Sequence, residues 1–154
     1  MDNWYVKLFN KSVLKQQKFR YLADFAGDCS NKSCLDLGSD NGVISYLLRQ
    51  RGGDWSSADL DDKTVSMIHE LVEKKVYKIN PPLAPFSDGV FDTVVIVDML
   101  EHVADDRAFL NEMYRIIRPG GCLVVHVPFA ARISLIRLLR AFLGLTDEQH
   151  GHLR

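Results

Sequence analysis

The chain has little cysteine, and its few cysteines fit neither a disulfide framework nor a metal site. Cys29, Cys34 and Cys122 are an odd number, and no CxxC pair or helical HExxH pair occurs in the 154 residues. The chain does not open with a basic segment followed by an apolar stretch, so no secretory signal is evident. We therefore predict a protein of the reducing cytoplasm without a bound metal, and we assign His150 and His152 to a solvated tail.

Long apolar runs and an excess of one charge are also absent. No apolar stretch reaches the roughly 18 residues that a membrane-spanning helix needs. Lys and Arg number 19 against 20 Asp and Glu, and this net charge of -1 disfavours nucleic acid as a partner. The length suits one domain over residues 1–154. We divide it into an N-terminal helical segment (1–33), a core (34–128), and an apolar helix with a tail (129–154).

What the sequence does contain is a regular alternation of strands and helices. Near-continuous Val, Ile and Leu runs are typical of parallel strands covered by helices on both faces. The predicted fold class is therefore α/β, a Rossmann-like, doubly wound and mainly parallel sheet. We expect five strands, at 33–37, 55–60, 76–80, 91–98 and 122–128. We expect one or two helices over 4–27, then helices over 41–53, 61–75 and 104–121, the last ended by its Pro-Gly-Gly.

Polar groups or glycine turns follow every predicted strand, where ligands bind in such sheets. Gly38 and Gly42 allow a sharp turn after the first strand, and the N–H groups of the next helix favour an anion. Asp59, 21 residues beyond Gly38, is placed to accept hydrogen bonds from two ribose hydroxyls. Together these features indicate a nucleoside with an attached anion. The alternative is that the glycines only form a turn and Asp59 only caps the next helix.

A longer pattern makes the prediction specific. The stretch LAPFSDGVFDTVVIVDMLEHVADDRAFLNEMYRIIRPGGCLVVHVP, read with CLDLGSDNG and ADLD, resembles class I S-adenosylmethionine-dependent methyltransferases. Within them it is most similar to the small-molecule and ubiquinone-type O-methyltransferases. The likeness runs from about residue 34 to 128 in the family's order and spacing. It implies methyl transfer from S-adenosylmethionine to a small, lipophilic acceptor, with S-adenosylhomocysteine as product.

The resemblance places the turn after the first strand against the methionine part of the cofactor. Asp36 and the turn from Gly38 to Gly42, with Ser39 and Asp40 inside it, would face that part. Many family members have glycine where this chain has Asp40, and aspartate tolerates left-handed geometry better than most residues. We expect Asp40 to change cofactor affinity rather than abolish binding, with a degenerate site as the alternative.

The resemblance also assigns residues at the other strand ends. Asp59 would hold the ribose hydroxyls and Leu60 would pack on the adenine. Asn80 stands where the family commonly has an aspartate that accepts a hydrogen bond from the adenine amino group, and its amide oxygen can still accept. Asp98 and Met99 would border the methionine amino group and the sulfonium.

Two residues after the fourth strand could serve the acceptor. His102 is the candidate general base or acceptor contact, because its unperturbed pKa lies close to neutral. The alternative is that Glu101 and His102 only shape the start of the next helix. We expect His126, inside an apolar strand, to be a satisfied core or lining histidine.

The last part of the chain leaves several alternatives open. Residues 131–143 are apolar with interspersed arginines, which suits an acceptor cover, a membrane surface, a second subunit or the domain's own core. The family fold continues with another helix and two strands, so we expect a truncated C-terminal part or a partner that replaces it. A non-catalytic domain that binds the cofactor or a partner protein is one alternative function, and a nicotinamide-dependent oxidoreductase is another.

Overall fold

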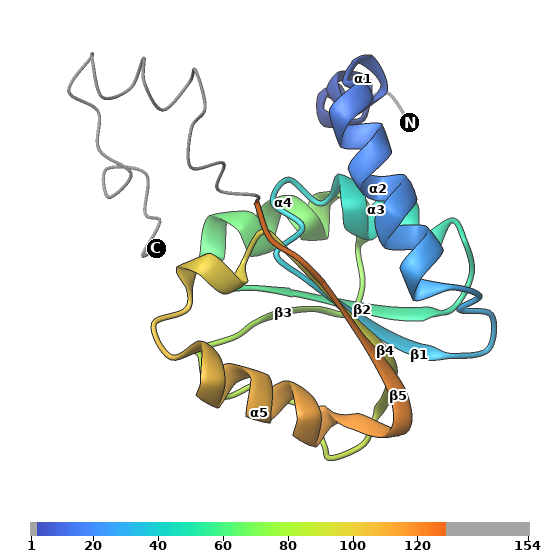
Figure 1. Cartoon of the computed structure of the whole chain (residues 1–154). Helices are drawn as coiled ribbons and strands as arrows, with labels where there is room; N and C mark the ends of the chain where they lie inside the picture. The colour runs from blue at the N-terminus through green and yellow to red at the C-terminus, as the bar shows by residue number, and fades with distance from the viewer. Residues whose placement is uncertain (1–2, 129–154) are drawn as a thin grey trace, which may run out of the picture.

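Five parallel strands form one sheet in the order β3-β2-β1-β4-β5 (Figure 1). The structure is a computed structural model and describes residues 3–128. The chain runs from β1 outwards to β3 and then crosses back to β4, so the strand order reverses beside β1. This confirms the predicted doubly wound α/β class. The strands are β1 (Ser33–Leu37), β2 (Asp54–Asp59), β3 (Val76–Lys78), β4 (Phe91–Val97) and β5 (Ile117–His126).

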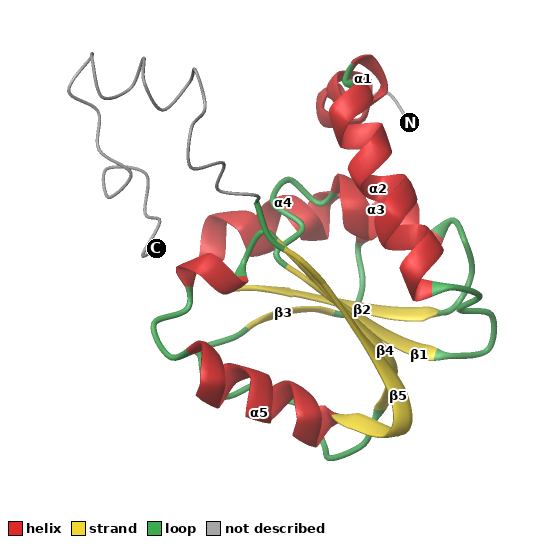
Figure 2. Ribbon diagram, viewed as in Figure 1, coloured by secondary structure: helices red, strands yellow, loops and turns green. Residues whose placement is uncertain are grey.

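Helices cover both faces of this sheet (Figure 2). The first four lie on one face and the fifth on the other, and a short 3-10 helix at Leu100–His102 links β4 to the fifth helix. The helices are α1 (Trp4–Lys11), α2 (Val13–Ala26), α3 (Val43–Arg49), α4 (Asp62–Val72) and α5 (Asp106–Ile116). None of the helices within residues 3–128 is long and apolar enough to cross a membrane.

Each face of the sheet has its own apolar core. Phe9 of α1, Leu22 of α2 and Leu48 of α3 belong to the core on one face. Phe109 and Met113 of α5 belong to the core on the opposite face. Alternate residues of β1 contribute to the two cores, because successive side chains of a strand point to opposite faces. The buried strand residues therefore fix which face each helix covers.

The boundary between α5 and β5 differs from the prediction. We expected Pro119, Gly120 and Gly121 to stop the helix before a strand at 122–128, but the helix already ends at Ile116 and the strand begins at Ile117. The Pro-Gly-Gly segment lies inside β5, where the pairing with β4 shifts register between Phe91 and Thr93. A Cβ on Gly121 would lie 2.9 Å from the backbone carbonyl oxygen of Asp92 in β4, so this close approach of the two strands requires glycine.

Some sequence predictions lie outside the described residues. These are the apolar segment 131–143 and the histidines at 150 and 152.

Candidate functional site

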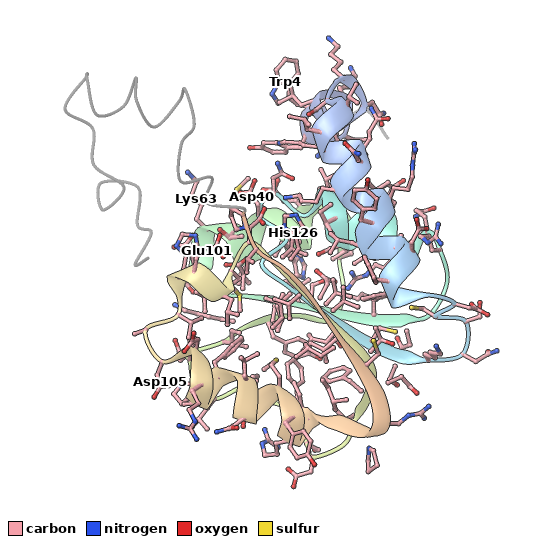
Figure 3. The ribbon with its side chains drawn as sticks, in the orientation of Figure 1. Trp4, Asp40, Lys63, Glu101, Asp105 and His126 are labelled. Atoms are coloured by element: carbon pink, nitrogen blue, oxygen red, sulfur yellow. The ribbon has the colours of Figure 1, made fainter. Side chains whose placement is uncertain are left out.

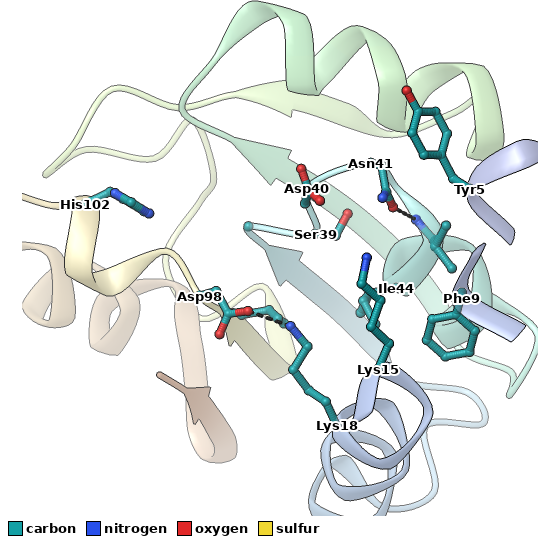
Figure 4. Close-up of a pocket in the computed structure, with 13 residues that line it drawn as sticks. Tyr5, Phe9, Lys15, Lys18, Ser39, Asp40, Asn41, Ile44, Asp98 and His102 are labelled. Carbon is teal, nitrogen blue, oxygen red and sulfur yellow. Dashed lines mark hydrogen bonds and ion pairs between the residues drawn. The ribbon is translucent and has the colours of Figure 1, made fainter. Parts of the chain in front are cut away.

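A pocket of about 370 Å³ opens at the carboxyl ends of β1 and β4 (Figure 4). One wall comes from the N-terminal helices, through Tyr5, Phe9, Lys15 and Lys18. The opposite wall comes from the turn after β1, the end of β4 and His102. The pocket lies where the strand order reverses, which is where open α/β sheets bind ligands.

Left-handed backbone geometry shapes the turn after β1. Gly38 and Gly42 both have φ of 79°, and Asp40 between them has φ of 53°. A Cβ on Gly38 would overlap the carbonyl oxygen of Val97 and lie 2.6 Å from Met99 Cβ. Asp40 therefore adopts the left-handed conformation we expected it to tolerate, and the turn passes close to the end of β4.

Asp36 lies beneath the turn and not on the pocket wall. Its side chain is fully buried and accepts hydrogen bonds from the hydroxyls of Ser45 and Ser57, the latter at 2.7 Å. Arg49 Nη1 lies 3.5 Å from the same carboxylate and also donates to Ser57 Oγ at 2.8 Å. Burial raises the pKa of Asp36, and the bonds from Ser45 and Arg49 oppose that rise. We expected Asp36 to face the ligand. The structure corrects this, because Asp36 belongs to a buried polar network under α3.

This network reaches the pocket through Ser39. Ser39 lines the pocket, and its Oγ lies 2.6 Å from Ser45 Oγ. Because the Ser45 hydroxyl donates its single proton to Asp36, Ser39 is the donor in this bond. The network therefore fixes the turn from below.

Asp59 ends β2 and is also largely buried. Its Oδ1 accepts from the backbone N–H of Leu60 at 2.7 Å and of Asp61 at 3.4 Å. Burial raises the pKa of Asp59, and these two N–H groups oppose the rise. The helix cap is Asp61, whose side chain accepts from the N–H of Thr64, so the alternative interpretation of Asp59 as a cap is wrong.

The remaining residues assigned to the cofactor have varied surroundings. Leu60 packs partly buried against the α5 core, and Met99 is buried under Gly38. Asn80 is exposed, and its backbone carbonyl accepts from the N–H of Leu83 at 3.2 Å. These three residues and Asp59 do not line the pocket wall described above.

Asp98 has two charged or titratable partners. Its Oδ2 lies 2.5 Å from Lys18 Nζ of α2, and its Oδ1 lies 2.6 Å from His126 Nδ1 of β5. Asp98 also has a left-handed φ of 46°. His126 is thus a hydrogen-bonded histidine that does not itself line the pocket but contacts a carboxylate that does.

Glu101 and His102 lie on the 3-10 helix after β4. His102 is exposed and lines the pocket, while both carboxylate oxygens of Glu101 are buried and lack a hydrogen-bond partner among residues 3–128. The helix that follows is capped by Asp105, which lies at its start (Figure 3). The Asp105 carboxylate accepts from Ala108 N at 2.9 Å. Glu101 and His102 therefore do not cap the start of α5.

Sequence reasoning missed the wall formed by the N-terminal helices. Lys15 and Lys18 are one turn apart on α2, and both extend into the pocket (Figure 4). A pair of lysines at this spacing is common on solvated helix faces. Only the placement of α2 across the ends of the strands shows that they belong to the site.

Comparison with known proteins assigns the family. The family model described as "Methyltransferase domain" matches residues 35–125. A ubiquinone biosynthesis O-methyltransferase of Bordetella avium is 29% identical over 110 residues, which cover 68% of this chain and 46% of that protein. The ubiquinone/menaquinone biosynthesis C-methyltransferase UbiE of Legionella pneumophila is 30% identical over 116 residues, 69% of this chain and 46% of that protein.

A solved structure agrees with these relatives in fold. A SAM dependent methyltransferase of Aquifex aeolicus superimposes with a TM-score of 0.62 at 17% identity, covering 84% of this chain and 76% of that one. The chain spans about half the length of the curated relatives it matches. The family match covers more than half of the chain, from β1 to β5, and the chain therefore belongs to the class I methyltransferase-domain family.

Proposed function

We propose that this chain is the cofactor-binding part of an S-adenosylmethionine-dependent methyltransferase that acts on a small, lipophilic acceptor. The observation that carries the proposal is the left-handed turn from Gly38 to Gly42, which borders a pocket at the reversal of strand order. Family membership supports the reaction type. The names of the ubiquinone-biosynthesis relatives support a small-molecule acceptor.

The residues present fit a nucleoside that carries an amino acid. Asp59, at the end of β2, offers a largely buried carboxylate for two ribose hydroxyls, and the structure gives its Oδ2 no partner among residues 3–128. Asp40 offers a carboxylate in the pocket for the cationic end of the cofactor, and Asp98 borders the same space as a carboxylate that is paired with Lys18. Leu60 and Asn80 would meet the adenine, and Met99 supports the turn from beneath.

The chemistry requires mainly positioning. The bound cofactor would supply a methyl group on a cationic sulfur, which an acceptor atom attacks in line. Tyr5 and Phe9 of α1 add aromatic surface to the pocket wall and would exclude water around the acceptor. If the acceptor is a hydroxyl group, His102 would take its proton on the imidazole ring.

The cytoplasm remains the proposed compartment. Cys29, Cys34 and Cys122 form no disulfide, and the first two are buried. Free thiols persist under reducing conditions. A solvent-exposed Cys122 is therefore compatible with the cytoplasm.

Calorimetric titration with S-adenosylmethionine and S-adenosylhomocysteine tests the cofactor site. We expect Asp59→Ala to weaken binding at least about tenfold, because a hydrogen bond to a charged group contributes about 1.5–3 kcal/mol. Asp54→Ala, at the exposed opposite end of β2, is the matched control and should bind like the parent chain. Binding that survives in Asp59→Ala would remove Asp59 from the site.

A second experiment separates catalysis from binding alone. Methyl transfer to a panel of phenolic and quinol acceptors should produce S-adenosylhomocysteine in step with methylated acceptor. A chain that binds the cofactor and never transfers the methyl group would support the non-catalytic alternative. NADH binding in place of either sulfur compound would support the oxidoreductase alternative.

A further inference from the structure

Lys18, from the N-terminal helices, forms an ion pair with the Asp98 carboxylate. Lys18 Nζ lies 2.5 Å from Asp98 Oδ2, and the two residues are 80 positions apart in the chain. The Lys18 side chain is 26% exposed to solvent and the Asp98 side chain 35% exposed, so the pair lies at the edge of the pocket and not in the core. His126 Nδ1, at 2.6 Å, occupies the other oxygen.

The surrounding structure holds Asp98 in this position. Its backbone N–H donates to the carbonyl of His126 at 3.0 Å, and its backbone has a left-handed φ of 46°. Lys18 extends from α2 across the pocket to reach it (Figure 4). The ion pair thus connects the wall formed by the N-terminal helices with the end of β4.

This contact changes the charge that a ligand meets. Asp98 alone would attract a cation, whereas Asp98 with an ammonium group at 2.5 Å presents almost no net charge to a ligand several ångströms away. Under the proposed function, S-adenosylmethionine has a cationic sulfur and S-adenosylhomocysteine a neutral one. The difference between their affinities therefore depends on how completely Asp98 is neutralised.

We propose that Lys18 is a specificity-determining residue of the site. By neutralising the Asp98 carboxylate, Lys18 reduces the difference between the affinity for S-adenosylmethionine, whose sulfur is cationic, and the affinity for S-adenosylhomocysteine, whose sulfur is neutral. This inference rests on the proposed function and deepens it. Lys18 acts through Asp98, as a positioning and charge-compensating residue.

The test measures how strongly each variant discriminates between the two ligands. Calorimetry at low ionic strength gives the ratio of the dissociation constant for S-adenosylhomocysteine to that for S-adenosylmethionine. We expect Lys18→Met to raise this ratio about two- to fivefold, the range of a partly exposed ion pair. The increase should shrink at high salt. Lys18→Arg keeps the charge and should keep the parent ratio.

Lys11→Met is the matched control, because Lys11 ends α1, is exposed and does not line the pocket. It makes the same change in net charge and should leave the ratio unchanged. Thermal unfolding checks each variant, and Lys18→Gln replaces Lys18→Met if the latter does not fold.

The outcomes separate the inference from the function on which it rests. A parent chain that binds neither ligand overturns both. A parent chain that binds both ligands, with an unchanged ratio in Lys18→Met, overturns the role of Lys18 alone. An equal rise in Lys11→Met would assign the effect to net charge and would also overturn it.

Discussion

Asp36 and Ser57 face each other across the β1–β2 ladder and share a hydrogen bond of 2.7 Å in the interior of the protein. Arg49 joins them from α3, with Nη1 on Ser57 Oγ and Nη2 on the carbonyl of Trp55 at 3.0 Å. A buried carboxylate is expensive unless it is paired and hydrogen-bonded, and this one has three donors. The network therefore couples α3, β1 and β2 beneath the pocket.

Removing this carboxylate should destabilise the fold strongly. Asp36→Ala leaves Arg49 without its counter-ion and two buried hydroxyls without their acceptor, so we expect the free energy of unfolding to fall by about 3–5 kcal/mol. Urea unfolding followed by circular dichroism measures the change. Asp54→Ala breaks an exposed pair with Lys75 and should cost less than about 1 kcal/mol. Equal losses in the two variants would contradict the structural role of Asp36.

Replacing Gly38 should cost stability for two reasons, a steric clash and a left-handed backbone, and a second glycine separates the two. Gly38→Ala combines a left-handed φ with a clash against Val97 and Met99, so we expect a loss of about 2 kcal/mol or more and weaker ligand binding. Gly120 has the same φ of 79° as Gly38, but nothing lies within 4 Å of where an alanine Cβ would stand, so Gly120→Ala should show only the backbone cost of about 1 kcal/mol. Urea unfolding of both variants gives their losses in the free energy of unfolding, and the difference between the two losses is the steric contribution at Gly38. No difference would contradict the close approach of the turn to β4.

Glu112 should contribute stability that disappears in acid. Its carboxylate accepts from Arg115 at 2.6 and 2.8 Å and from the N–H of Ala84 at 2.8 Å, and the bonds from Arg115 lower its pKa below 4.5. A lowered pKa in the folded state means that this contribution is present above pH 4.5 and is lost as the pH falls through the lowered value.

Glu112→Gln should therefore lower the melting temperature at neutral pH and flatten its decline in acid. Melting curves collected across the acid range for both chains measure this. The two chains should differ most at neutral pH and converge in acid. A constant difference at every pH would contradict the ion pair as the source of the stability.

Phe109 should anchor α5 to the sheet. It is fully buried in the core on the α5 face, so Phe109→Ala should lower the free energy of unfolding by about 3–5 kcal/mol. Tyr114 on the same helix is 85% exposed, and Tyr114→Ala should change stability by less than about 0.5 kcal/mol. Chemical denaturation of both variants tests the assignment, and a similar effect of the two would argue against it.

Sequence reasoning predicted the sheet because its information is local. The apolar runs of β1 and β4 and the glycine turn after β1 each lie within a few residues, and the five strands follow from them. The same reasoning failed at Pro119 to Gly121, since proline and glycine can end a helix or form an irregular segment of an edge strand. Only pairing with β4 decides between the two.

The pocket was harder to predict because two of its main features depend on distant contacts. The pairing of Lys18 with Asp98 spans 80 residues, and no local pattern signals it. Asp36 did offer a signal, because Ser45 and Arg49 are four residues apart on one face of α3. A strand carboxylate opposite such a pair is better interpreted as buried and satisfied than as exposed to a ligand.

The bond between Ser39 and Ser45 has a consequence for how a ligand would bind. Ser39 is held by a chain of hydrogen bonds that ends at Arg49, so the turn has its shape before any ligand arrives. The conformational entropy of ordering this turn is then lost when the chain folds and not when the ligand binds. A ligand that enters the pocket meets a preorganised surface, and its affinity is not reduced by the cost of arranging that surface.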